Sequence, residues 1–448
     1  LSPSLRALSN AWTYGTDGVA LREQDGRDII LTPVDYLGRG LTENALLSEF
    51  KPVQCSPLTI FSWVCRSSGP GAISLQGGAT PSKPLTPSIV RKAVLRAARY
   101  LMLRQEKSGR FRYEYDPCKD GIVEGYNMVR HAGVLWALLR LYKSAKDERL
   151  LQCSLRGTKY LIQQLERDGS CAYLGRDGRS VLGGTALSIL ALLNLPPEHK
   201  TAKMMALSRA LGKGLLSLQH SSGAFYITLA DQKAGRLPNP TPRFYPGECL
   251  LAICQLWRQD NHDRWSLAAR RAAHNQITNF RQNGTTCHWS VQGLVEVGDI
   301  LHSRPILGAA SDMVRVLVAR QCSDLNSPLL GSWPTSIGAP TACSAACRLE
   351  ALGPALEAIR SLDEPVADLE NIMLRATQFI ISQQFCEENS FLLPQPKEAI
   401  GGIRRTPHIF AIRMDINQHA IAALLNTLTL LHQRPCLAAA LREESQQG

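Results

Sequence analysis

The sequence predicts a mainly α-helical protein: an (α/α)6 toroid of six helix pairs, preceded by a small β-rich N-terminal module. Two observations support this prediction. After residue 86, apolar residues recur at the spacing of amphipathic helices, and one helix–loop–helix unit repeats along the chain. Before that point, Gly, Pro, Ser and Thr are frequent and apolar runs are short, which is typical of strands between turns. We therefore place the N-terminal module at residues 1–85 and the toroid at residues 86–448.

Short apolar runs in the N-terminal module predict strands at Gly18–Leu21, Asp28–Leu31 and Leu58–Val64. Turn-forming residues near Gln24–Gly26 separate the first two runs, so we expect a hairpin there. The segment Gly77–Pro87 is rich in Gly and Pro and predicts a linker to the helical part.

Each repeat unit begins with an amphipathic helix that ends near a Gln. A loop with a Gly and often an aromatic residue follows, and then a more apolar helix. The first helices of the pairs are expected at Val90–Gln105, Leu150–Gln164, Ala202–Gln219, Asp263–Gln282, Ala309–Gln321 and Glu364–Gln384. The second helices are expected to begin near Arg130, Thr185, Gly247, His288, Thr341 and Gln418. Six consecutive pairs can close into a ring, with the more apolar helices inside and the amphipathic ones outside.

The Gln–Gly–aromatic punctuation resembles that of terpene-cyclase and prenyltransferase toroids, and the six-fold count resembles toroidal glycoside hydrolases, polysaccharide lyases and sugar epimerases. The resemblance covers roughly residues 88–435 and implies the architecture more than any single activity. The chain has no DxDD run and no evident Asp, Cys and His trio of the prenyltransferase kind. These departures disfavour terpene chemistry, so the glycan-active toroids are the expected relatives.

The composition narrows the range of partners. The net charge of +12 favours an anionic partner, but no run of five basic residues and no nucleic-acid signature occurs, so we expect an acidic glycan rather than nucleic acid. Apolar runs such as Ala186–Leu195 are too short to span a membrane. The thirteen scattered cysteines favour a reducing compartment and hence the cytoplasm; a periplasmic location stays open if a signal segment was removed. The oligomeric state does not follow from the sequence.

Polar residues recur where the second helices begin, and these positions should meet at one end of a toroid. They are His131, Thr185, Glu248, His288, Thr341 and His419. We expect the two threonines to cap their helices. Adding charged and aromatic neighbours gives candidate catalytic residues Glu248, Asp415, His131, Tyr245, His288 and His419. Candidate substrate-binding residues are Tyr126, Asn127, Arg130, Arg243, Trp289, Trp333 and Arg413, of which the aromatic ones can stack on sugar rings.

Three chemistries are compatible with these residues. Glu248 and Asp415, from units three and six, can act as the two carboxyl groups of a glycosidase. Asn127, Arg130, His131 and Tyr245 resemble the residue types with which toroidal lyases stabilise and deprotonate a uronate, and His288 with His419 resembles the histidine pair of toroidal epimerases. A metal site of three histidines and Glu248 is the third possibility, but no short ligand spacing such as HxxxH supports it. The sequence therefore predicts neither metal nor cofactor.

We expect a carbohydrate-active enzyme that hydrolyses, eliminates or epimerises an anionic poly- or oligosaccharide in the central cavity of the toroid. The alternative is a non-catalytic glycan-binding or scaffold protein of a polysaccharide assembly or export system.

Overall fold

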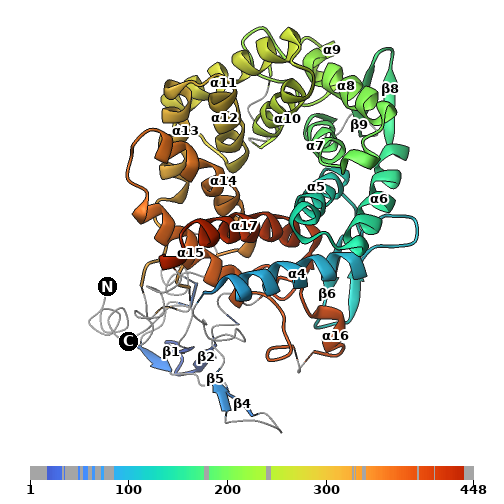
Figure 1. Ribbon diagram of the computed structural model, residues 1–448. Coiled ribbons are helices and arrows are strands. Elements are labelled where there is room, and N and C mark those ends of the chain that lie inside the picture. Colours follow the sequence, from blue (N-terminus) through green and yellow to red (C-terminus); the bar gives the residue numbers. More distant parts are fainter. Residues whose placement is uncertain are drawn as a thin grey trace.

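Two concentric rings of helices make up most of the protein (Figure 1). The computed structural model describes residues 18–32, 35, 49–50, 54–58, 63–65, 72–74, 85–175, 181–238, 244–324, 327, 329–334, 340–390, 393–407 and 409–437. The inner ring consists of α5 (Met128–Ala145), α7 (Val181–Leu193), α10 (Tyr245–Asp260), α12 (His288–Ile300), α14 (Ala342–Ser361) and α17 (Met414–Gln433). The outer ring consists of α4 (Pro87–Leu103), α6 (Glu148–Gln163), α8 (Ala202–Ser217), α11 (Asp263–Asn283), α13 (Arg304–Val318) and α15 (Ala367–Ser382).

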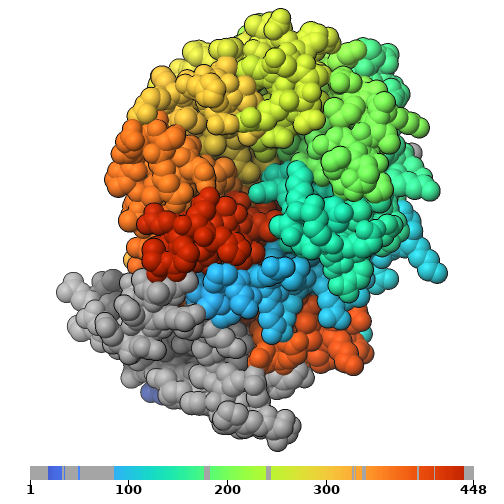
Figure 2. All heavy atoms as spheres, in the orientation of Figure 1, coloured from blue at the N-terminus to red at the C-terminus, as the bar shows by residue number. Residues whose placement is uncertain are grey.

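The inner ring is closed. Each inner helix packs on the next one in chain order, and the last, α17, packs on the first, α5, as well as on α4. Figure 2 shows this junction on the surface, where the red C-terminal helix lies against the light-blue α4. The predicted (α/α)6 toroid is therefore confirmed, including the order of outer and inner helices.

The repeated glutamine links neighbouring outer helices. Gln105 donates from Nε2 to the carbonyl of Cys153 in α6 (2.9 Å), and Gln384 donates to the carbonyl of Ala93 in α4 (3.0 Å). The same bond joins Gln219 to Ala268 and Gln321 to Ile372. Since Gln384 reaches the first outer helix from the last, this sequence signal also helps to close the ring.

The repeated glycine allows the close approach that these bonds need. Gly109 has a positive φ of 94°, and a Cβ there would lie 2.3 Å from the carbonyl oxygen of Arg156. Gly401 has a φ of 91° and meets the carbonyl of Arg96 at the same 2.3 Å. A side chain at either position would separate two outer helices, which explains why the punctuation includes Gly.

Helix boundaries differ from the expected ones at two inner helices. The last begins at Met414 rather than near Gln418, and α7 begins at Val181 rather than at Thr185. Thr341 caps α14 as expected, because its Oγ1 accepts from the amide of Ser344 (3.0 Å). Thr185 does not cap: it lies inside α7 and accepts from the amide of Leu174 (3.0 Å).

Small sheets complete the described chain. The N-terminal residues form β1 (Gly18–Arg22), β2 (Asp28–Leu31) and β3 (Gln54–Leu58), in the antiparallel order β2-β1-β3, and the pair β4 (Trp63–Cys65) and β5 (Ala72–Ser74). The expected hairpin is present, since β1 and β2 pair across the turn at residues 23–27. The predicted third strand instead falls partly in β3 and partly in β4, and residues 59–62 between them lie outside the described part. Of the expected linker, the structure describes only its last residues, from Leu85.

Further short elements lie in the connections between helices. They are β6 (Glu114–Asp116), β7 (Gly121–Val123), β8 (Leu165–Asp168), β9 (Cys171–Leu174), β10 (Ile412–Arg413), a 3-10 turn at Pro197–His199, α9 (Leu229–Lys233) and α16 (Pro396–Ala399). β10 pairs with β6, and β6 pairs with β7, so the loop before α17 is tied to the loop before α5. The eleven cysteines whose side chains the structure describes are all free, and none of the described helices has the length and hydropathy to span a membrane.

Candidate functional site

Four side chains that can bind a metal or move a proton meet inside the ring. We call them the central cluster: His288 from α12, Cys347 and Glu350 from α14, and His419 from α17. His419 Nδ1 lies 2.6 Å from Glu350 Oε2, and His288 Nε2 lies 3.8 Å from the same oxygen. Glu350 is fully buried, whereas Cys347 and His419 are partly exposed. The structure thus brings together the two predicted histidines His288 and His419.

The two imidazoles of the central cluster differ in charge because their surroundings differ. Burial disfavours the charged form of His419, but the Glu350 carboxylate beside it outweighs burial and raises the pKa of His419 to about 10. Burial and the charge on His419 hold the pKa of His288 well below its usual value. Without a metal, His419 is therefore an imidazolium paired with Glu350, and His288 is neutral.

Glu248 lies in the first turn of α10, close to the central cluster. Its side chain is buried, and its Oε2 has no hydrogen-bond partner. Across from it, Gly183 of α7 leaves the necessary room, since a Cβ there would lie 2.5 Å from Oε2 and 2.4 Å from the ring of Tyr245. Burial raises the pKa of Glu248 to about 8, so it is a neutral carboxylic acid at pH 7.

A pair of arginines holds Asp415 where α17 begins. Arg413 forms two parallel hydrogen bonds with the carboxylate (2.8 and 2.9 Å), and Arg130 of α5 adds an ion pair of 2.9 Å. Arg130 also lies over the ring of Tyr113, 5.1 Å from its centre. Two guanidinium groups on one carboxylate leave a net positive charge, and both are partly exposed. We call Arg130, Arg413 and Asp415 the rim; its positive charge can attract an anionic group.

His131 lies apart from the central cluster, although its position in the repeat matches that of His419. Its Nε2–H donates to the carbonyl of Gly157 in α6 (3.0 Å), which makes Nδ1 the acceptor for the Tyr126 hydroxyl (2.5 Å). The rings of Phe111 and Tyr160 pack on it. Burial lowers the pKa of His131 to about 4, so it is neutral. Both nitrogens are therefore occupied, and the Nε2 bond holds the inner helix α5 against the outer helix α6.

The remaining predicted residues lie in different surroundings. Asn127 caps α5 by accepting from the amide of Arg130 (3.2 Å). Trp333 donates from its indole nitrogen to the carbonyls of Val318 and Ala319, where the outer helix α13 ends. Arg243 lies outside the described residues.

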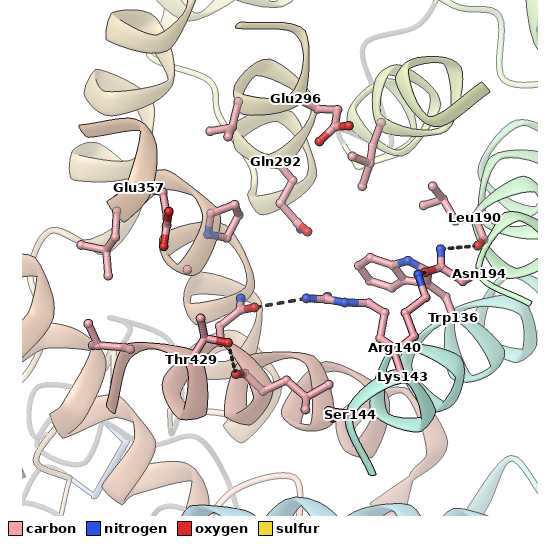
Figure 3. Close-up of a pocket in the computed structure, with 18 of the residues that line it drawn as sticks. Trp136, Arg140, Lys143, Ser144, Leu190, Asn194, Gln292, Glu296, Glu357 and Thr429 are labelled. Carbon is pink, nitrogen blue, oxygen red and sulfur yellow. Dashed lines mark hydrogen bonds between the residues drawn. The ribbon is translucent and has the colours of Figure 1, made fainter. Parts of the chain in front are cut away.

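Trp289 helps to close the middle of the ring. It is buried, and its ring lies 5.2 Å from that of Trp136, which comes from the opposite inner helix, α5. On the other side of this pair, toward the C-terminal ends of the inner helices, is a cavity of about 540 Å³ (Figure 3). Arg140 and Lys143 point into it and bond to Asn426 (3.2 Å) and Asn194 (2.6 Å). We call the two ends of the ring its mouths: this cavity lies toward the mouth where the inner helices end, and the central cluster with Glu248 lies nearer the mouth where they begin.

Sequence reasoning missed Glu350 and Cys347. Only the first turns of the inner helices were compared, and Glu350 lies in the third turn of α14. A signal was present: Cys343, Cys347 and Glu350 are spaced i, i+4, i+7, so they share one helix face. The cysteines look like small apolar residues in that pattern, and Glu350 is an acidic residue on the same face of the helix.

Comparison with known proteins supports the fold. No family model matches the chain, and no curated protein matches it in sequence. Among solved structures, an unsaturated glucuronyl hydrolase specific for heparin is 11% identical, with a TM-score of 0.56 over 77% of this chain and 98% of that one. The GH76A α-1,6-mannanase from Salegentibacter sp. HEL1_6 is 10% identical, with a TM-score of 0.57 over 77% and 99%. Cellobiose 2-epimerase from Spirochaeta thermophila is 14% identical, with a TM-score of 0.53 over 77% and 97%.

These proteins are similar in fold along nearly their whole length, while their sequences have diverged almost completely. At such identities the likeness extends to the arrangement of the helices and not to the chemistry of the interior. The comparisons and the closed inner ring agree: the chain has the (α/α)6 toroid fold shared by glycoside hydrolases and sugar epimerases.

Proposed function

We propose that this protein is a carbohydrate-active enzyme that hydrolyses a glycosidic bond in an acidic oligo- or polysaccharide, with Glu248 as the general acid. The observation that carries the proposal is the state of Glu248: a buried carboxyl group inside a toroid, with one oxygen free of partners and a pKa raised to about 8. A general acid must hold its proton at working pH, and burial achieves this here.

The reaction needs a second carboxyl group, and Asp415 is the candidate. Glu248 gives its proton to the leaving glycosidic oxygen, and the bond from this oxygen to the anomeric carbon breaks. Water adds to the anomeric carbon, and Asp415 accepts the proton that the water loses. Glu248 and Asp415 come from α10 and α17, the third and sixth inner helices, on opposite sides of the ring.

The rim supports an acidic substrate. Arg130 and Arg413 together carry one positive charge more than Asp415 neutralises, and the whole chain has a net charge of +12. A uronate carboxylate can bind guanidinium groups with two parallel hydrogen bonds. Among the proteins of similar fold, one acts on unsaturated glucuronyl groups and is specific for heparin.

Epimerisation is a second candidate, because two imidazoles face each other in the central cluster. The rings of His288 and His419 are 5.4 Å apart, edge to face, and come from two different inner helices. A neutral imidazole can remove a proton from a sugar carbon, and an imidazolium beside it can return one. A toroid of similar fold is a cellobiose 2-epimerase.

The test is incubation with a panel of acidic and neutral glycans. Hydrolysis predicts new reducing ends without the ultraviolet absorbance of an unsaturated uronate, whereas β-elimination would produce that absorbance. Epimerisation would produce neither, but would exchange a carbon-bound hydrogen for solvent deuterium. Binding without any product would instead favour the non-catalytic glycan-binding alternative and overturn the proposal.

Variants assign the roles. Glu248→Gln keeps the size of the side chain and removes the proton, so turnover should fall at least ~100-fold while substrate binding persists. The turnover of Asp415→Asn should fall by a comparable factor. Glu357→Gln is the matched control, because Glu357 lies on α14 in the opposite mouth, bonded to Gln433. Equal activity in all three variants would exclude the two carboxyl groups from catalysis.

A further inference from the structure

We infer that the central cluster is a zinc site, with His288, Cys347, Glu350 and His419 as its four ligands. Each residue offers one ligand atom, and these atoms all lie within 4.8 Å of one another. Zinc bonds of about 2.0–2.3 Å place tetrahedral ligand atoms roughly 3.3–3.8 Å apart. Small side-chain rotations, of about 1 Å at the ligand atoms, therefore bring the set to zinc geometry.

The type of ligand selects the metal. Two imidazoles, one thiolate and one carboxylate form a mixed nitrogen, sulfur and oxygen set that suits zinc, whereas magnesium and calcium need oxygen ligands only. The ligands come from three inner helices. Within α14, Cys347 and Glu350 are three residues apart and lie on one face.

Charge balance also favours a divalent cation. A thiolate, a carboxylate and two neutral imidazoles carry a charge of −2, so the complex with Zn²⁺ is neutral, which suits a site of which Glu350 is fully buried and His288 nearly so. Two nitrogen or oxygen atoms of the proposed ligands are available to bind a metal. His288 Nε2 and Glu350 Oε1 are buried and have no hydrogen-bond partner. A metal bond to His288 Nε2 would give this nitrogen the partner that the protein does not supply.

The proposed ligands are accessible to an ion, and a neighbouring residue can orient one of them. Cys347 and His419 are partly exposed, so an ion can reach the set. Cys343, one turn before Cys347, hydrogen-bonds to its thiol and can orient it. Four protein ligands fill a tetrahedral site, so the ion would join α12, α14 and α17 rather than bind substrate.

The inference does not depend on the proposed hydrolysis, because neither Glu248 nor Asp415 is a ligand. It does bear on the second candidate: imidazoles that bind zinc cannot exchange protons with a sugar. The expectation of no metal rested on the absence of a short histidine spacing and of an Asp, Cys and His trio, whereas two of the ligands proposed here form a Cys-x-x-Glu pair on α14.

The experiment uses the full chain after dialysis against a chelator. Titration with Zn²⁺ in competition with a chromogenic chelator should show one tightly bound ion per chain, with Kd below about 1 µM. Substitution with Co²⁺ should produce a near-ultraviolet thiolate-to-cobalt band together with visible bands of tetrahedral cobalt. Zinc should also raise the midpoint of thermal unfolding, which checks binding without any activity assay.

Variants show where the ion binds. Cys347→Ala should abolish the thiolate band, and both Cys347→Ala and His288→Ala should weaken zinc binding at least ~100-fold. Cys118→Ala is the control, because Cys118 is exposed and outside the ring, and its affinity should equal that of the unchanged chain. Circular dichroism before titration verifies that each variant is folded.

Two results would overturn the zinc site: no stoichiometric binding by the folded chain, or zinc binding of unchanged affinity in folded His288→Ala and folded Cys347→Ala. Should Cys347→Ala fail to fold, Cys347→Ser decides, since serine keeps the shape and cannot give the thiolate band.

Discussion

His131 and His419 are predicted from the sequence to hold matching places in the first and sixth repeat units, yet they have different surroundings in the structure. His131 faces outward and bonds to Gly157 in the outer helix α6, whereas His419 faces inward and pairs with Glu350. Arg140, nine residues after His131 on α5, lines the interior cavity. Nine residues at 100° each turn the helix by about 180° net, so His131 must face away from the interior. His131 is the fourth residue of α5 and His419 the sixth of α17, so the two positions differ by about 200° around their helix axes.

Of the changes considered, removing the carboxyl group of Glu248 should have the largest effect on activity. It tests whether groups that face the interior of the ring carry out the reaction. Glu248→Gln should lower kcat about 10²–10⁴-fold, because proton donation to the leaving group is lost, while KM changes little. Steady-state kinetics on a responsive glycan provides the measurement. A normal kcat in this variant would show that Glu248 is not the general acid.

Truncating His131 tests whether this outward-facing histidine stabilises the fold and takes no part in catalysis. His131→Ala should lower the free energy of unfolding by about 3 kcal/mol, since a buried ring is lost and the Gly157 carbonyl loses its partner. Tyr126→Phe removes only one hydrogen bond and should cost about 1 kcal/mol. Denaturant unfolding measures both. Turnover per folded molecule should be normal in both variants; a large loss of kcat at unchanged stability would return His131 to the catalytic group.

The pH dependence follows from burial of Glu248. Since the pKa rises from 4.5 to about 8, the general acid loses its proton above that pH, and kcat should fall about tenfold per pH unit on the alkaline side. Between these two values the folded protein holds a proton that the unfolded chain releases, so stability should decrease as pH rises through the window.

Glu248→Gln should remove the contribution of Glu248 to this slope in stability, so the change in the free energy of unfolding between pH 5 and pH 8 should differ between the variant and the unchanged chain. A slope that is the same in the variant and in the unchanged chain would show that Glu248 titrates normally. The comparison is best made on chelator-treated protein, so that no metal changes the local charge.

Removing a positive charge beside Asp415 should have the smallest effect on activity. Arg130→Gln removes one of the two guanidinium groups around Asp415, so KM for an acidic glycan should rise about three- to tenfold while KM for a neutral analogue changes less. The difference should shrink with added salt if attraction to the rim is electrostatic. Equal changes for both substrates would indicate that Arg130 only positions Asp415.

The ring could be predicted from the sequence because its signals are local and repeated. Gln105 and Gln384, with the glycines that follow them, mark each unit and also make the bonds that join outer helices. Helix starts were less certain: α17 begins four residues before the expected Gln418, because Asp415 and Gln418 look like loop residues until the arginines around Asp415 are seen.

Only part of the site could be predicted, because its members meet through packing of distant helices. His288, Glu248, Asp415 and His419 were expected near the same mouth, and the structure brings His288 and His419 to one carboxylate. That carboxylate, Glu350, was missed since it lies deep in an apolar helix. Pairing of Tyr126 with His131 depends on the rotation of α5, which no local pattern specifies.

The central claim is that an acidic sugar binds inside the mouth where the inner helices begin, within reach of Glu248. A crystal structure of Glu248→Gln soaked with an acidic oligosaccharide tests it most directly. The account predicts a glycosidic oxygen within hydrogen-bond reach of position 248, with a sugar carboxylate at Arg130 or Arg413. Sugar bound in the opposite mouth at Arg140 and Lys143, or on the outer surface alone, would contradict it.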